Sequence, residues 1–250
     1  MKKYILYIPW VVLFILLVSN IIFQSDRLVN NLILYGSWLY LLISFYYRNS
    51  DRFYLFVKRL QMKRKNYDVK WNMQLVYEGD FSEETFELIY DHAKKIYKNT
   101  KMVDLSEYKR LFTIGTLKPE VLIEDNKLTF SFYDQQMSYN RAYKIIDKEV
   151  GKLFEDLKSV VGGENAEYYI KIVFEDVNPF TGLFLQNVQN ENIINYDVRL
   201  SFDNNKISIN KNYIEFYSLT LSEINEQAKD YLSLSYNPIK NLKEQGSSNY

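Results

Sequence analysis

The sequence contains no cysteine, and among its 250 residues there are only 1 His, 8 Gly and 4 Pro. Without cysteine the chain can form no disulfide, no thiolate nucleophile and no zinc–thiolate site. The single histidine, His92, leaves no second imidazole for a histidine-based metal site. Glycine is too scarce to favour a long phosphate-binding loop. We therefore expect no catalytic residues, no metal and no cofactor.

The net charge of the chain is zero, but its charges are unevenly distributed. The first 65 residues contain 10 Lys or Arg and 2 Asp or Glu, whereas the remainder contains 21 and 29. A basic N-terminal part is thus followed by an acidic body. Because an acidic body repels phosphates, we do not expect nucleic acid as a partner.

Two long uncharged stretches predict a transmembrane hairpin in residues 1–50. Residues 4–23 include no charged side chain, and as a helix they would be about 30 Å long, the thickness of a bilayer's hydrocarbon core. Residues 32–47 add a second apolar stretch, about 24 Å long as a helix. A cleaved signal peptide is the alternative for the first stretch, and a buried or re-entrant helix for the second.

The basic residues that flank these stretches predict the orientation of the hairpin. Lys2 and Lys3 precede it and a strongly basic segment follows it, while the link between the spans has no net charge. By the positive-inside rule both termini are then cytoplasmic. The expected localisation is the cell membrane, as a multi-pass protein.

Residues 51–66 predict a basic amphipathic helix next to the membrane. Phe53, Phe56, Val57 and Leu60 recur at helical spacing among cations. Such a helix can lie in a layer of anionic headgroups, where each basic residue contributes about 1 kcal/mol. An ordinary helix that merely continues from the second span is the alternative. The expected membrane-surface residues are Arg52, Lys58, Arg59, Lys63, Arg64, Lys65, Phe53 and Phe56.

Residues 67–236 predict a cytoplasmic α+β domain. Strand and helix patterns follow in the order β-α-β-β-α-β over residues 69–175, which is the order of a ferredoxin-like fold, and a C-terminal β-hairpin and helix come after them. Residues 105–112 favour helical turns. Residues 237–250 predict a disordered tail.

Several residues mark the expected ends of these elements. Ser82 is placed to cap the first helix of the domain, and Gly162 to stop the second. Asp125-Asn126 and Asn204-Asn205 are typical of tight hairpin turns. Thr220 and Glu223 form the pattern of a capping box before the last helix.

Tyrosine is abundant, with 23 residues. Aromatic side chains are favoured on ligand and partner surfaces, although a compositional bias of the coding sequence is the simpler explanation of the excess. Candidate residues of such a surface are Tyr133, Tyr139, Tyr143, Tyr168 and Tyr169, with Tyr213 and Tyr217 as further members.

These patterns predict a two-pass inner-membrane protein that presents a non-catalytic binding domain, as an accessory or regulatory subunit of a membrane-associated system. Its expected partners are anionic lipid headgroups and a protein at the cytoplasmic face. Gly36 and Ser37 would also allow the hairpin to form a homo-oligomer.

Two alternative functions remain. The layout resembles that of two-span effectors of bacterial anti-phage defence, and this resemblance implies a cytoplasmic domain that senses a signal such as a nucleotide, with spans that disrupt the bilayer. The other alternative is a membrane-anchored, metal-dependent enzyme, with Glu124, Glu175 and Asp176 as carboxylate ligands of magnesium.

Overall fold

The computed structural model describes residues 14–15, 18–19, 22, 28–162, 164–175, 178–185, 193–202 and 205–235. By its internal contacts the chain divides into two compact units, Met1–Val57 and Lys58–Tyr250.

The first unit contains helix α3 (Leu28–Asn49) and the beginning of helix α4 (Asp51–Lys65). Ser50 connects the two helices. Its carbonyl oxygen accepts a hydrogen bond from the Tyr54 N–H at 2.9 Å, and its hydroxyl oxygen accepts one from the Phe53 N–H at 3.3 Å. A capped start of this kind satisfies N–H groups that a helix cannot pair internally.

The transmembrane hairpin expected in residues 1–50 is wrong, because no helix in the described part of the chain has both the length and the apolar character needed to span a bilayer. The expected second span lies within α3, but that helix also includes Asn30, Asn31 and Arg48. The predicted localisation as a multi-pass membrane protein with cytoplasmic termini is wrong on the same ground. Most of the expected first span, residues 4–23, lies outside the described residues.

The second unit is built on a single antiparallel sheet of nine strands, in the order β2-β3-β4-β5-β1-β6-β9-β8-β7. The first strand of the chain is therefore the central strand, and later strands add on both sides of it. The strands are β1 (Asp68–Glu78), β2 (Thr100–Ser106), β3 (Lys109–Ile114), β4 (Glu120–Glu124), β5 (Lys127–Ser138), β6 (Glu164–Phe174), β7 (Asp197–Phe202), β8 (Asn205–Asn210) and β9 (Tyr213–Ser218).

Side chains on β1 alternate between a dry face and a wet face. Trp71, Met73, Leu75 and Tyr77 are fully buried or nearly so, while the residues between them are polar or only half-buried. Successive side chains of a strand point to opposite faces, so β1 divides the sheet into two chemically different surfaces. Its neighbours follow the same rule, because residues that pair across strands share a face.

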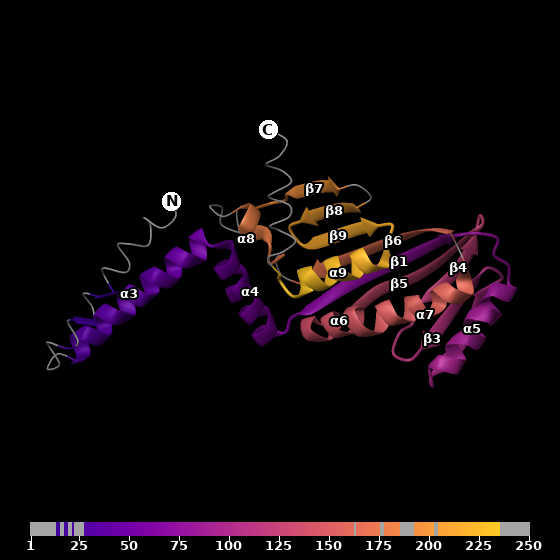
Figure 1. Cartoon of the computed structure of the whole chain (residues 1–250), viewed down its shortest axis with the longest axis horizontal. Helices are drawn as coiled ribbons and strands as arrows, with labels where there is room; N and C mark the ends of the chain where they lie inside the picture. The colour runs from indigo at the N-terminus through magenta and orange to yellow at the C-terminus, as the bar shows by residue number, and fades with distance from the viewer. Residues whose placement is uncertain are drawn as a thin grey trace. The chain divides into compact units, whose positions relative to one another are not determined.

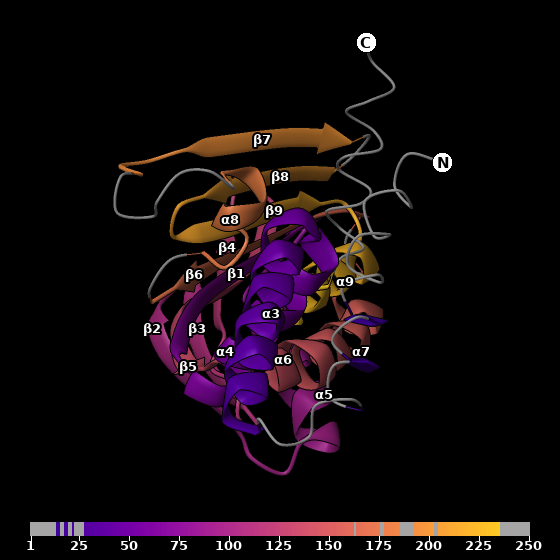
Figure 2. The ribbon, with the colours of Figure 1, turned by 90° about the vertical axis from the view of Figure 1, so that its left-hand side faces the viewer.

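Within the described part of the second unit, the helices that pack on the sheet lie against its dry face (Figures 1 and 2). These helices bury an apolar stripe against the sheet. Phe154 of α7, for example, is completely buried. On this side a short helix, α8 (Thr181–Phe184), follows Phe180, whose ring lies 4.9 Å from that of Tyr231. The covering helices are α5 (Glu84–Ile96), α6 (Tyr139–Ile145), a π-helical turn η2 (Ile146–Val150), α7 (Gly151–Val161) and α9 (Leu221–Leu232).

The structure is α+β, but the expected ferredoxin-like domain is wrong, because the sheet has nine antiparallel strands. The C-terminal strands β7 and β8 pair with each other as expected, and through β9 they extend the main sheet beyond β6. Residues 105–112, expected to hold helical turns, belong to the β2–β3 hairpin. Most of β2 is exposed, so it lacks the buried alternation that reveals a strand in a sequence.

Several local predictions are confirmed. Asp125 and Asn126 have φ of 51° and 60°, as a tight turn between β4 and β5 requires. The hydroxyl oxygen of Thr220 accepts a hydrogen bond from the Glu223 N–H at the start of α9.

Two other local predictions are not met. Ser82 does not occupy the cap of α5, where Glu83 stands instead. The expected Asn204-Asn205 turn is displaced, since Asn205 already begins β8 and Asn204 lies outside the described residues.

Replacing Phe154 by alanine tests the core. Its ring meets those of Phe130 and Phe132 edge-on, with centroids at 5.7 and 5.8 Å. We expect Phe154→Ala to lower the free energy of unfolding by about 3–5 kcal/mol in chemical denaturation. Leu219→Ala, at a side chain 50% exposed, serves as control and should change it by less than about 0.5 kcal/mol. Equal effects of the two would contradict this core.

Gly162 offers a test of backbone conformation without a packing change. It ends α7 with φ +61°, and a Cβ added there would meet no atom within 4 Å. We expect Gly162→Ala to cost about 1–2 kcal/mol of unfolding free energy, since a left-handed conformation penalises a Cβ. Gly36→Ala is the matched control, because that glycine lies within α3 and also has open space around it. Destabilisation by both substitutions alike would refute the explanation.

Candidate functional site

The face of the sheet opposite the helices carries a group of tyrosines, Tyr133, Tyr169, Tyr213 and Tyr217, which we call the tyrosine face. Tyr169 on β6 pairs with Tyr217 on β9, and their ring centroids are 4.7 Å apart. Gln74 on β1 pairs with Tyr169 and donates a hydrogen bond to the hydroxyl of Tyr133 at 3.2 Å. Tyr133 and Tyr217 are 50% and 45% exposed. The face thus extends across four adjacent strands.

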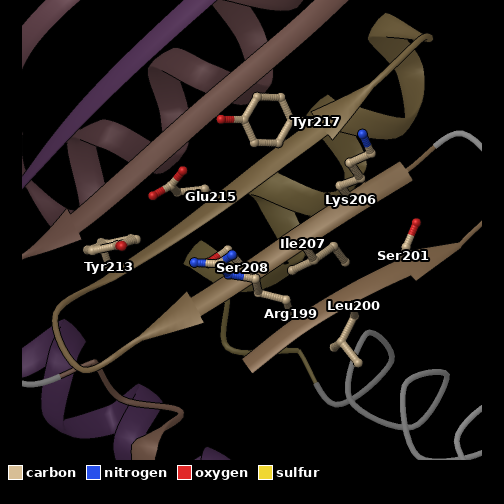
Figure 3. Close-up of a pocket in the computed structure, with 9 residues that line it drawn as sticks. All are labelled: Arg199, Leu200, Ser201, Lys206, Ile207, Ser208, Tyr213, Glu215 and Tyr217. Atoms are coloured by element: carbon tan, nitrogen blue, oxygen red, sulfur yellow. The ribbon is translucent and has the colours of Figure 1, made fainter. Parts of the chain in front are cut away.

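The alternation of β6 and β9 places these side chains. In β6, Ile170 and Ile172 are completely buried against the helices, so Tyr169 and Lys171 point the other way. In β9 the buried residues are Ile214 and Phe216, which leaves Tyr213, Glu215 and Tyr217 on the open side. Figure 3 shows these three side chains on the same side of β9.

Lys171 connects the centre of the tyrosine face. Its Nζ lies 3.2 Å from Oε1 of Glu215, the residue that pairs with it across the strands. The same Nζ lies 3.8 Å from the ring centroid of Tyr213, within the range of a cation–π interaction. Both charged side chains are mostly buried, with 28% and 16% of their surface exposed. The three groups hold one another in place.

Burial and charge suppress ionisation of the central tyrosines. Burial raises the pKa of Tyr169, and the nearby carboxylate of Glu215 raises it further. The pKa of Tyr217 is raised by burial first and by Glu215 second. Their hydroxyls therefore remain neutral hydrogen-bonding groups under physiological conditions.

A shallow hollow of about 400 Å³ lies on the outer strands β7, β8 and β9 (Figure 3). Two of its lining residues are held by Asp197, whose carboxylate accepts hydrogen bonds from Arg199 Nε at 2.7 Å and from the Ser208 hydroxyl at 3.1 Å. The hollow therefore combines aromatic, hydroxyl and charged groups. It is lined by Arg199, Leu200, Ser201, Lys206, Ile207, Ser208, Tyr213, Glu215 and Tyr217.

Charges on the open side of the sheet are largely paired with each other. Since residues that pair across strands share a face, the register places four ion pairs of the described residues on this side. The pairs are Lys171–Glu215, Arg199–Asp197, Lys127–Glu78 and Lys109–Glu120.

The structure brings together only part of the tyrosine surface expected from the sequence. Tyr133 and Tyr169 lie on the tyrosine face, whereas Tyr168 is 5% exposed and Tyr139 is 2% exposed on the helix side. Tyr143 is half-buried on α6. Tyr168 and Tyr169 are neighbours in one strand, so they cannot share a face.

Sequence reasoning missed four charged residues of the site: Lys171, Glu215, Arg199 and Lys206. A usable signal was present in β6 and β9, because Lys171 and Glu215 each alternate with buried apolar residues and so share the face of a tyrosine two positions away. Nothing in the sequence shows that these two strands are neighbours.

The expected membrane-surface residues all lie on α4. The helix is confirmed, but its buried side chains are Leu55 and Met62, while Phe56 and Leu60 are 55% and 53% exposed. Phe53 and Lys58 are half-buried, and the remaining cations, Arg52, Arg59, Lys63, Arg64 and Lys65, are exposed. Binding of this helix to anionic headgroups stays a prediction.

Among the described residues, no three histidine, aspartate or glutamate side chains gather closely enough to hold a metal ion. Of the expected carboxylate ligands, Glu124 is exposed at the end of β4, and Glu175 accepts a hydrogen bond from the Asp68 N–H at 3.2 Å. Asp176 lies outside the described residues. His92 is half-buried on α5.

Comparison of the chain with protein-family models and with curated proteins finds no match.

Glu215→Gln tests the electrostatics of this site. Because a negative charge opposes formation of a phenolate, its removal should lower the pKa of Tyr169, which burial still keeps above the ordinary value near 10. The titration is followed by NMR of chains with ¹³C-labelled tyrosine rings. Glu167→Gln, a change at an exposed acid on the same strand, should leave that pKa unchanged. An unchanged pKa in Glu215→Gln would show that the carboxylate does not face the ring.

Proposed function

We propose that this chain is a non-catalytic protein-binding molecule, an accessory or regulatory subunit that holds its partner on the tyrosine face. The observation that carries the proposal is the one-sided covering of the sheet. Helices bury one face, and the opposite face exposes tyrosines among paired charges over several strands.

The residue types of the tyrosine face suit a protein partner. Tyrosine combines a large apolar ring with a hydroxyl, and it loses little conformational entropy when a partner fixes it, so it is frequent among the residues that dominate binding energy. Tyr169 and Tyr217 already lie against each other, and Lys171 is held by Glu215 and Tyr213. Such preorganisation reduces the entropic cost of association.

The charges support a protein partner over a nucleic acid. A phosphate backbone binds to cations that have no competing acid nearby, and its affinity grows with their number. On the open side of the sheet, Lys171 and Arg199 are each bound to a carboxylate of the chain itself. The hollow beside them can accept one side chain that protrudes from a partner.

Site-specific photo-crosslinking in the native host tests the proposal. A benzoylphenylalanine placed at Tyr217 or at Tyr133 should form a covalent adduct with the same protein from both positions. Placed at Lys152, which is exposed on α7 on the helix side, it should not form that adduct. Adducts with nucleic acid, or equal adducts from all three positions, would refute the proposal.

The partner identified in this way then allows a quantitative test with purified proteins. We expect the double variant Tyr169→Ala/Tyr217→Ala to weaken its binding by at least about 2 kcal/mol, roughly thirtyfold, as loss of a central aromatic pair does. Lys152→Ala should bind as the unaltered chain does, and the circular dichroism of all variants confirms folding. Undiminished binding of the double variant would place the partner elsewhere.

A further inference from the structure

We propose that strand β2 pairs with β2 of a second copy of this chain, so that two sheets join across a two-fold axis. This surface is separate from the tyrosine face, and the proposal does not rest on the partner inferred above.

Strand β2 ends the sheet and is unusually exposed. It pairs with β3 on one side, and on its other side no strand of the described residues follows. Val103 and Leu105 are 55% and 50% exposed, and Tyr108 in the turn to β3 is 54% exposed. An edge with unpaired N–H and C=O groups and apolar side chains is a template for another strand.

The opposite edge of the sheet is less suited to pairing. On β7 the apolar residues Val198 and Leu200 are half-buried, and Arg199 alternates with them. Arg199 is bound to Asp197, and 82% of its side-chain surface is exposed to water. Charged side chains on an edge strand oppose pairing, which favours β2 as the site of association.

The sequence of β2 is self-complementary in the register centred on Val103. In an antiparallel pair, residues that face each other lie on the same side of the sheet, so a two-fold axis normal to the sheet passes midway between the two copies of one residue. With the axis between the two copies of Val103, these two side chains, each 55% exposed, face each other. An axis at Asp104 would place two carboxylates opposite each other, which is destabilising.

The remaining pair in this register is also acceptable. Met102 faces Asp104 of the second copy, and the carboxylate of Asp104 is already bound to Nε of Arg110 at 2.6 Å. A bulge between Asp104 and Ser106 limits the pairing to the first part of the strand.

The absence of native cysteine makes the register directly measurable in the full chain. Facing Cα atoms of an antiparallel pair are about 4.5–5.5 Å apart, within the range that a disulfide bridges. Under mild oxidation Val103→Cys should form a covalent dimer, whereas Ile194→Cys, at a residue 94% exposed outside β2, should not. Met102→Cys and Asp104→Cys should each stay monomeric alone but crosslink when mixed.

Sedimentation velocity of the unaltered chain provides the independent measurement. We expect a reversible dimer. Val103→Lys should raise its dissociation constant about tenfold or more, because it places two cations opposite each other, whereas Ile194→Lys should leave the constant unchanged. A monomer at all concentrations, or crosslinking of Val103→Cys no faster than that of Ile194→Cys, would overturn the proposal. Crosslinking in the host to a different protein would also overturn it, since β2 would then hold another strand.

Discussion

The two-sided alternation of strand β1 is the constraint on which the rest of the second unit depends. Trp71, Met73, Leu75 and Tyr77 point to one side and are removed from water, and the side chains between them are left on the other. β5 and β6 pair with β1 on its two sides. A shift of either strand by one residue would move its apolar set into water, so β1 fixes both register and face for the whole sheet.

The side chains that β1 and its neighbours turn away from the helices form the proposed binding surface. Since the helices use only the dry face, every strand from β5 to β7 presents its alternate residues outward. Tyr169 meets Tyr217 only because β6 and β9 are neighbours, and Lys171 meets Glu215 for the same reason. The site is therefore a property of strand order, and no single segment of the chain contains it.

Local features of the fold could be predicted from the sequence because they depend on nearby residues. The turn at Asp125-Asn126, the end of α7 at Gly162 and the cap at Thr220 each follow from the conformational preferences of one or two side chains. The hairpin of β2 and β3 could not be predicted from the sequence, because an exposed edge strand has no alternation of buried and exposed residues. Residues 32–47 are apolar enough to suggest a span, but α3, in which they lie, is not.

The site could be predicted only in part, because local patterns in the sequence do not show which distant strands are neighbours. Tyr169 could be assigned to the exposed side from its alternation with Ile170, but its pairing with Tyr217 joins strands that are distant in the chain. The register between such strands is set by the packed core as a whole. Charged residues that later form ion pairs, such as Glu215, carry no sign of their partner in the sequence.

The central claim is that the tyrosine face is covered by a protein in the cell. Hydroxyl-radical footprinting, in the living host and on the purified chain, tests it most directly. We predict that Tyr133 and Tyr217 are oxidised less in the host than in the purified chain, while Leu88 on the helix side reacts equally in both. Equal oxidation of the two tyrosines in both settings would contradict the account.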